Sequence, residues 1–185
     1  MADPVGSVDG DLVTDPATPV PSPMSDPEFV AGLRPIPSRT AADAPTWEAS
    51  DLSGVRHDGS VATIELAGIE RPLLLVFLSL RCDGCETFWE GMSDAEDPVL
   101  AEVTPVVVTK GPGTVDAVEV GLLAHRLGGT PVVMSDRAWT DYRVTGYPFL
   151  VLVEPGSRRI LAEAVGFGWT DVDSMVRVGL GRAGQ

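Results

Sequence analysis

The 185-residue sequence contains only two cysteines, two histidines and one lysine. Two cysteines are too few for the disulfide framework of a small secreted scaffold, and they cannot complete a structural zinc site by themselves. Basic residues are scarce as well, since 13 Lys and Arg stand against 27 Asp and Glu and give a net charge of −14. Nucleic acids and anionic bilayers are also polyanions, so we expect neither as a partner.

A long hydrophobic run is also missing. The longest apolar stretch, residues 73–80, is interrupted by Ser79, whereas a membrane-spanning helix needs about 20 apolar residues. The first residues lack the basic and apolar regions of a secretory signal. We therefore expect a cytoplasmic chain without a membrane segment, and an exported or anchored form only if the native N-terminus extends further.

The first 43 residues differ in composition from the rest. Residues 1–45 hold nine of the 16 prolines, seven acidic residues and a single aromatic residue, Phe29. Such a segment buries too little apolar surface to offset the entropy cost of ordering. We predict a disordered Pro/Asp-rich tail over residues 1–43 and one domain over 44–185. The tail is either an inert linker or an arm that docks a partner through Phe29–Val30 and Leu33.

Strand and helix patterns alternate from residue 44 onward. Alternating or fully apolar runs predict strands at 61–66, 73–78, 103–108, 131–134, 149–153 and 160–165. Amphipathic spacing and cap residues predict helices at 82–92, 115–127, 136–143 (a helical turn) and 171–180. Residues 51–54 are expected to form a turn, and the last two strands a hairpin. This order predicts an α/β domain with a mixed sheet and helices on both faces.

Cys82 and Cys85 lie where the expected strand 73–78 gives way to a helix. A helix N-terminus offers unpaired N–H groups and a partial positive charge, which favour a thiolate at the first cysteine. A spacing of three residues puts both sulfurs on one side of the first turn. We therefore predict a redox pair in which Cys82 is the exposed nucleophile and Cys85 the resolving thiol.

The residues beside this pair have opposing effects. Arg81 favours the Cys82 thiolate, whereas Asp83 and Glu86 disfavour it by like charge. Two other interpretations of the pair stay open, namely a metal site and two cysteines without a role in a non-redox module. The two histidines have no ligand spacing to the cysteines, which disfavours the metal site.

A second feature is the pair Tyr147–Pro148, directly before the strand 149–153. Proline is tolerated at the start of a strand, so a purely structural role would explain it when taken alone. Together with the strand–CxxC–helix segment, however, it resembles the thioredoxin superfamily, in which a cis-proline loop faces the cysteine pair. The resemblance implies a cis Tyr147–Pro148 bond that keeps metals from the thiolates. It also implies that the Tyr147 backbone pairs with a substrate peptide as a short added strand.

A narrower resemblance is to the TlpA/ResA-like and MauD-like branch. It rests on Ala44–Trp47 (APTW), on residues 51–54 (DLSG) and on residues 77–85, which read FLSxxCxxC. Sixty-three positions separate Cys85 from Pro148, enough for the α/β insertion that this branch has between the CxxC helix and the cis-proline strand. The resemblance covers about residues 44–183 and implies a thioredoxin-like fold.

Two residues near the redox pair depart from the family pattern. Arg81 replaces the tryptophan that usually precedes the first cysteine, and Val76 replaces the buried carboxylate of many thioredoxins. Without that acid, the Cys85 proton must pass to water or another group, for which Glu65 is a candidate. A peroxiredoxin-type peroxidase is a less favoured alternative, because the proline and threonine that precede its reactive cysteine are absent before Cys82.

These features predict a protein thiol–disulfide oxidoreductase that needs no bound cofactor or metal, because electrons pass through the dithiol itself. Its substrates would be proteins with thiols or a disulfide, and an upstream reductase or oxidase would reset it. We expect a monomer. The competing interpretation is a non-catalytic thioredoxin-like binding or scaffold module that recruits a partner in the groove near Pro148.

Overall fold

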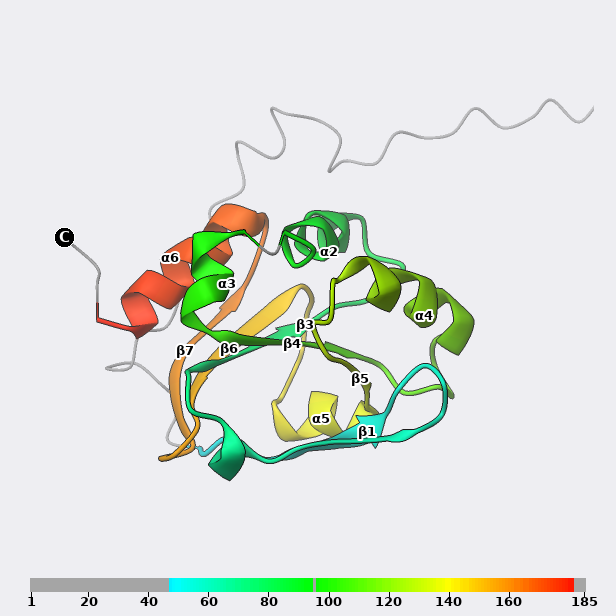
Figure 1. Ribbon diagram of the computed structural model, residues 1–185, viewed down its shortest axis with the longest axis horizontal. Coiled ribbons are helices and arrows are strands. Elements are labelled where there is room, and N and C mark those ends of the chain that lie inside the picture. The colour runs from blue at the N-terminus through cyan, green and yellow to red at the C-terminus, as the bar shows by residue number, and fades with distance from the viewer. Residues whose placement is uncertain (1–46, 95, 182–185) are drawn as a thin grey trace, which may run out of the picture. The chain divides into compact units, whose positions relative to one another are not determined.

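The structure is a computed structural model, and it describes residues 47–94 and 96–181. In this part of the chain, seven strands form one mixed sheet in the order β2-β1-β5-β4-β3-β6-β7 (Figure 1). The strands are β1 (Leu52–Val55), β2 (Val61–Ile64), β3 (Leu73–Phe77), β4 (Thr104–Thr109), β5 (Val132–Met134), β6 (Phe149–Glu154) and β7 (Arg159–Val165). The helices are η2 (Leu66–Gly68), η3 (Asp83–Cys85), α2 (Glu86–Gly91), α3 (Pro98–Glu102), α4 (Ala117–Arg126), α5 (Asp136–Asp141) and α6 (Trp169–Gly179). The predicted α/β architecture is therefore confirmed.

The strand before the cysteines, β3, lies at the centre of the sheet. It pairs in parallel with β4 and antiparallel with β6, so that Phe77 lies between Val108 and Phe149. All five residues of β3 are fully buried, which explains why the run is apolar without alternation. β6 and β7 form the predicted hairpin. The end of β3 is thus held by neighbours on both sides.

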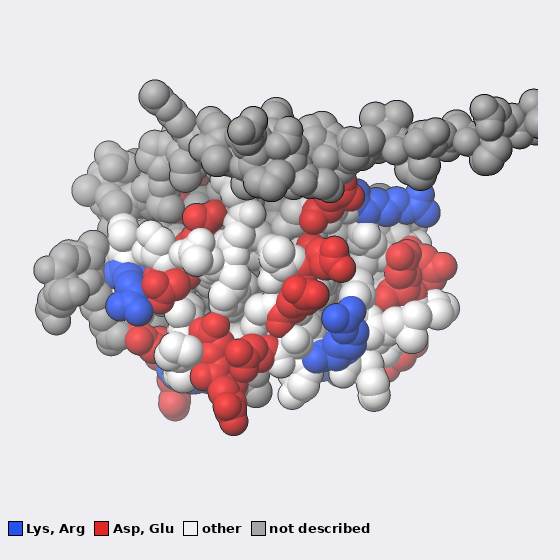
Figure 2. All heavy atoms as spheres, turned by 90° about the horizontal axis from the view of Figure 1, so that it is seen from above, with Lys and Arg blue, Asp and Glu red and all other residues white. Residues whose placement is uncertain are grey.

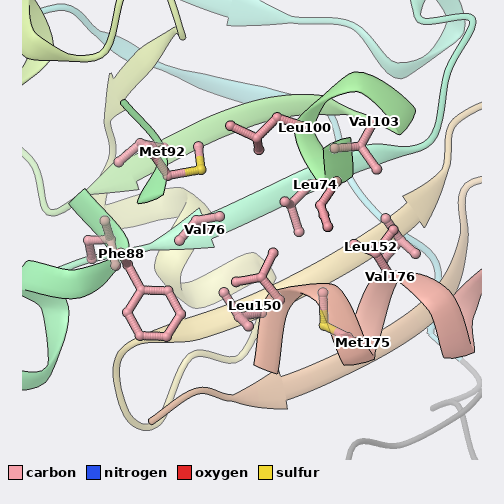
Figure 3. Close-up of a cluster of buried hydrophobic side chains, with 14 of the residues drawn as sticks. Leu74, Val76, Phe88, Met92, Leu100, Val103, Leu150, Leu152, Met175 and Val176 are labelled. Atoms are coloured by element: carbon pink, nitrogen blue, oxygen red, sulfur yellow. The ribbon is translucent and has the colours of Figure 1, made fainter. Parts of the chain in front are cut away.

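Alternate residues of β3 pack into two separate cores. Leu74 and Val76 face the core beneath α2, α3, α4 and α6 (Figure 3). Leu73, Leu75 and Phe77 face the core that α5 covers on the opposite side. Figure 1 shows the four helices above the sheet and α5 below it. The segments α4, β5 and α5 fill the interval between the CxxC helix and Pro148, where the α/β insertion was expected.

The segment 51–54 was wrongly predicted to be a turn. Strand β1 begins at Leu52 and pairs antiparallel with β2. The turn lies further along, where Gly59 has a φ of 82° and the Arg56 N–H donates to the Ser60 carbonyl at 2.8 Å. Because a strand is stabilised by its partner, the turn-like composition of this short segment was a poor guide.

Two helices also differ from the prediction. The expected helix 82–92 is divided into the 3₁₀ turn η3 and the α-helix α2. Helix α3 was not predicted, although the sequence carries its start signals: Pro98 is the first helical residue, and the Asp97 carboxylate accepts the Val99 N–H at 2.8 Å.

The predicted tail over residues 1–43 lies outside the described residues, together with the anchors suggested at Phe29–Val30 and Leu33. The domain boundary at residue 44 therefore stays a prediction. Among the described residues, none of the helices combines the length and the apolar character needed to cross a membrane.

Candidate active site

Cys82 lies just beyond the carboxyl end of β3. The N–H of Leu78, the first residue after the strand, still donates to the Val108 carbonyl of β4 at 3.0 Å. The chain then leaves the sheet through a turn at Leu80–Arg81 and enters η3. Because β3 is buried on both faces, the hydrophobic core fixes the point from which the cysteine loop starts.

Cys82 and Cys85 are joined by a disulfide bond. Their Cα atoms are 5.3 Å apart, and the Cys85 N–H donates to the Cys82 carbonyl at 2.9 Å. Cys85 is 1% exposed, whereas Cys82 is only half-buried. Cys82 is therefore the more accessible residue of the pair from solvent.

The Tyr147–Pro148 segment faces this disulfide. The peptide bond between the two residues is cis, and the Pro148 carbonyl accepts the Gly166 N–H at 3.0 Å. The Cys82 Sγ lies 4.0 Å from the Tyr147 carbonyl oxygen. A disulfide sulfur has no proton to donate, so in this oxidised form the approach is a contact and not a hydrogen bond.

The Tyr147 side chain contacts an aromatic residue that the sequence did not connect with this site. Its ring lies edge-on to Trp139 of α5, with 5.7 Å between centroids. Lys110, the single lysine of the chain, places its Nζ 4.5 Å from the centroid of the same Trp139 ring. Trp139 is 4% exposed. The local sequence around residues 110 and 139 does not predict these contacts with its ring, because they depend on the packing of α5 against the sheet.

Two adjoining cavities open beside Cys82 and share Ser79, Leu80, Arg81 and Glu119. The smaller, about 320 Å³, extends toward Lys110, Trp139 and Tyr147. The larger, about 520 Å³, contains Cys82 and lies between α2 and α4; we call it the α2–α4 groove. Its lining residues are Ser79, Leu80, Arg81, Cys82, Asp83, Glu86, Trp89, Glu90, Glu119, Leu122, Leu123 and Arg126. Sequence reasoning did not find the contribution of α4, because residues 119–126 reach Cys82 only through the tertiary packing.

The surface around Cys82 is more acidic than basic. Arg81 is exposed and lines both cavities, while Asp83 and Glu86 line the α2–α4 groove, as do two further glutamates. Figure 2 views the molecule from the side of α2, α3, α4 and α6, where acidic side chains form several patches and basic side chains are fewer. Arg81, Asp83 and Glu86 thus all line a cavity that contains Cys82, and their opposing effects on its thiolate stay a prediction.

No buried carboxylate accompanies the cysteines within residues 47–94 and 96–181. The buried polar residues there are Thr109 and Ser135, and Val76 is fully buried in the apolar core that includes Cys85. Glu65 is exposed beyond the end of the edge strand β2. Four strand spacings separate β2 from β3, or about 19 Å. The structure therefore does not bring Glu65 to the redox pair.

Among the described residues, no group of three or more His, Cys, Asp or Glu side chains is arranged to hold a metal ion. The two histidines lie elsewhere: His57 approaches Gly121 of α4, and His125 is exposed in the last turn of that helix.

Comparisons with known proteins agree with this geometry at the level of the fold. No protein-family model matches the chain, and no curated protein matches it. Among solved structures, a thioredoxin family thiol:disulfide interchange protein of Chlorobium tepidum is 21% identical, with a TM-score of 0.52 over 75% of this chain and 99% of that one. The chain has a thioredoxin-like fold.

Two further structures support this assignment of the thioredoxin-like fold. A protein of Chlorobium tepidum described as a thiol:disulfide interchange protein DsbE is 20% identical, with a TM-score of 0.57 over 74% of this chain and 96% of that one. A secreted disulfide oxidoreductase of Mycobacterium tuberculosis is 14% identical, with a TM-score of 0.52 over 70% and 95%. At these identities the likeness concerns the fold, and the chemistry must be argued from the site.

Proposed function

We propose that the protein is a thiol–disulfide oxidoreductase acting on protein substrates through Cys82 and Cys85. The observation that carries the proposal is the difference between the two sulfurs: Cys82 is accessible beside the Tyr147 carbonyl, and Cys85 is 1% exposed. An asymmetric disulfide of this kind directs attack to one sulfur and protects the other for the resolving step. The solved structures with the same fold include disulfide oxidoreductases.

The reaction with a dithiol substrate proceeds in two exchanges. A substrate thiolate attacks the Cys82 sulfur, a mixed disulfide forms, and Cys85 leaves as a thiolate that takes up a proton. The second substrate thiolate then attacks the substrate sulfur of the mixed disulfide and releases Cys82. Two electrons pass from the substrate to the protein, and the substrate becomes a disulfide; the reverse sequence reduces a substrate disulfide.

In this proposal, the residues beside Cys82 orient the substrate and set its electrostatic environment. The Tyr147 backbone pairs with the substrate segment next to its cysteine, Pro148 shapes that loop, and Arg81 stabilises the Cys82 thiolate. No bound cofactor takes part, and the protein acts as a monomer. We expect the chain in the cytoplasm. The same thiol–disulfide exchange would operate there and in an exported form of the protein.

A redox titration followed by thiol alkylation tests the proposal. The protein is equilibrated in a dithiothreitol or glutathione series, alkylated with a mass-shifting reagent and resolved on a gel. Both thiols are expected to appear together at one defined potential, and the Cys85→Ser variant is expected to accumulate mixed disulfides through Cys82. A pair that never forms a disulfide, with no adducts of the variant in native extract, would support the binding or scaffold module instead.

A further inference from the structure

Helix α4 presents two large apolar side chains to solvent, one of which lines the groove that contains Cys82. Leu122 is 69% exposed and Val118, one helical turn before it, is 73% exposed. The opposite side of the helix packs against the domain, where Val120 is fully buried in the core. Of these two exposed side chains, Leu122 lines the α2–α4 groove, where an apolar surface is available to a partner.

Leu122 belongs to the same groove as the accessible sulfur. The apolar wall of the α2–α4 groove consists of Leu80, Trp89, Leu122 and Leu123, and Cys82 lies in the lining of the same cavity. Trp89 and Leu123 also pack against the core, so this wall is held rigidly. A segment that approaches Cys82 through this groove therefore meets a preformed apolar surface with space for side chains.

The acidic residues of the groove come from both of its sides. Glu86 and Glu90 belong to α2, and Glu119 belongs to α4. Within the described part of the chain, the ion pairs are Arg137–Asp141, Arg158–Asp51, Arg159–Glu154 and Arg177–Asp173, so these three glutamates form no ion pair there. With Asp83, the groove lining holds four acidic residues against two basic ones, Arg81 and Arg126, and so offers an excess of negative charge beside apolar surface.

We propose that the α2–α4 groove is a specificity site for basic protein substrates. This proposal rests on the function proposed above. The groove binds the substrate segment next to the reactive cysteine, and this segment carries an aliphatic side chain and one or more lysines or arginines. The aliphatic side chain packs on Leu122, and the basic side chain lies opposite Glu119 and Glu90.

Charge complementarity selects this occupant over the chain itself. A second copy carries the same net charge of −14, and residues 1–45 carry seven acidic and two basic residues. Both would bring like charge to the glutamates, which costs binding energy. A basic segment is instead attracted, so the association rate should rise and should fall again with added salt.

The test uses the full chain with Cys85→Ser, so that Cys82 forms a stable mixed disulfide. Two peptides are prepared, each with one cysteine linked to 2-nitro-5-thiobenzoate, differing only in having Arg-Leu or Glu-Leu on both sides of that cysteine. Attack by the Cys82 thiolate joins it to the peptide sulfur and releases the coloured thiolate. The measured quantity is the ratio of the two second-order rate constants, in which changes of intrinsic thiol reactivity cancel.

The basic peptide is expected to react faster, and added salt should bring the ratio closer to one. Glu119→Gln and Glu90→Gln should each lower the ratio by about two- to fivefold, the range of an exposed charge pair. The matched control is Glu70→Gln, an exposed acid beyond the opposite end of β3, which should leave the ratio unchanged. Leu122→Ser should slow both peptides.

Each contrary result has a definite meaning. Equal rate constants for the two peptides overturn the specificity site while leaving the proposed function intact. Failure of Cys82 to form a mixed disulfide with either peptide overturns the proposed function itself. If both peptides react slowly and Leu122→Ser makes the reaction faster, a segment of this protein occupies the groove. If dilution of the parent protein also makes the reaction faster, that occupant is a second copy of the chain.

Discussion

The Cys82 sulfur lies 4.0 Å from the Tyr147 carbonyl oxygen, although 65 positions separate the two residues in the sequence. The central strands bring them together, because β3 ends shortly before Cys82 and β6 begins directly after Pro148. The antiparallel pairing of Phe77 with Phe149 aligns those two strand ends. The Tyr147 backbone therefore lies beside one sulfur of the pair, while Cys85 stays buried.

The two cysteines should differ in reactivity once the disulfide is reduced. We expect Cys82 to react with iodoacetamide on the order of tenfold faster than Cys85, because a buried thiol reacts only after local opening. Limiting reagent followed by peptide mass spectrometry measures the two rates. In denaturant the rates should converge, and equal rates in the folded protein would contradict the assigned roles.

Two glycines near the redox pair should respond differently to alanine. A Cβ at Gly84 would lie 3.8 Å from the Pro148 Cδ and 4.0 Å from the Cys82 Sγ, both ordinary contacts. A Cβ at Gly91 would lie 2.2 Å from the Trp169 indole, whose N–H donates to the Asp97 carboxylate at 2.7 Å. Accommodating it must displace that ring and strain its hydrogen bond.

We therefore expect Gly84→Ala to change the free energy of unfolding by less than about 1 kcal/mol. Gly91→Ala should lower it by about 1–3 kcal/mol, the usual cost of overpacking. Urea unfolding of the oxidised variants measures both changes. A Gly91→Ala protein as stable as the parent would show that Trp169 has another position available at little cost.

Local sequence signals explain what could be predicted here. An apolar strand, a CxxC and a helix follow one another in the chain, so the sequence predicted that Cys82 and Cys85 lie at the junction of a strand and a helix. Strand β1 was missed because its stability comes from pairing with β2. The α2–α4 groove was missed because Glu119 and Leu122 meet Cys82 only after α4 packs on the sheet, and no local pattern encodes that approach.

Installing the acid that many thioredoxins carry should destabilise this protein. Val76 is fully buried in the apolar core, near Phe88 and Leu150 (Figure 3). Val76→Asp should lower the free energy of unfolding by about 3 kcal/mol or more, because a carboxyl there has no built partner. Val76→Thr, which is neutral and similar in shape, should cost about 1–2 kcal/mol.

The Val76→Asp penalty should grow with pH. Burial would raise the pKa of the introduced carboxyl, so the folded state keeps the proton after the unfolded state has lost it near pH 4. Stability then falls as the pH rises from about 4 to 8, which urea unfolding at several pH values can follow. Equal stability of the Asp and Thr variants at about pH 8 would mean that the core admits water or a counter-charge.

An ion pair should make a pH-dependent contribution at the other end of the sheet. The Arg158 Nη2 lies 2.9 Å from both Asp51 carboxylate oxygens, and the Leu66 N–H donates to Asp51 at 2.9 Å. These hydrogen bonds, the one from Arg158 foremost, lower the Asp51 pKa. The stability they confer is therefore present above the unfolded pKa of about 3.9 and lost as the pH falls below it.

Asp51→Asn should accordingly lower the free energy of unfolding by about 0.5–1 kcal/mol at neutral pH, since the pair is partly exposed and screened. The difference from the parent should shrink as the pH falls through 4 and below. Urea titrations at several pH values measure this difference. A difference that is constant with pH would assign the effect to packing and not to charge.

Tyr142 should produce the opposite pH dependence. Its side chain is 1% exposed, and its hydroxyl donates to the Ser50 carbonyl at 2.5 Å. Its ring lies 5.5 Å from that of Phe77, the last residue of β3. Burial raises the Tyr142 pKa well above its usual value, so its contribution to stability is complete below the unfolded pKa of about 10 and is lost as the pH rises above it.

Tyr142→Phe should therefore cost about 1 kcal/mol at neutral pH, where the Ser50 carbonyl loses its donor. Above about pH 10 the parent loses stability through this hydroxyl and the variant does not, so the difference should narrow. Tyr147→Phe serves as the control, because Tyr147 is 47% exposed and its removal should leave the alkaline loss of stability in place. A Tyr142→Phe difference that is unchanged between neutral pH and about pH 10.5 would show that the phenol ionises without leaving the core.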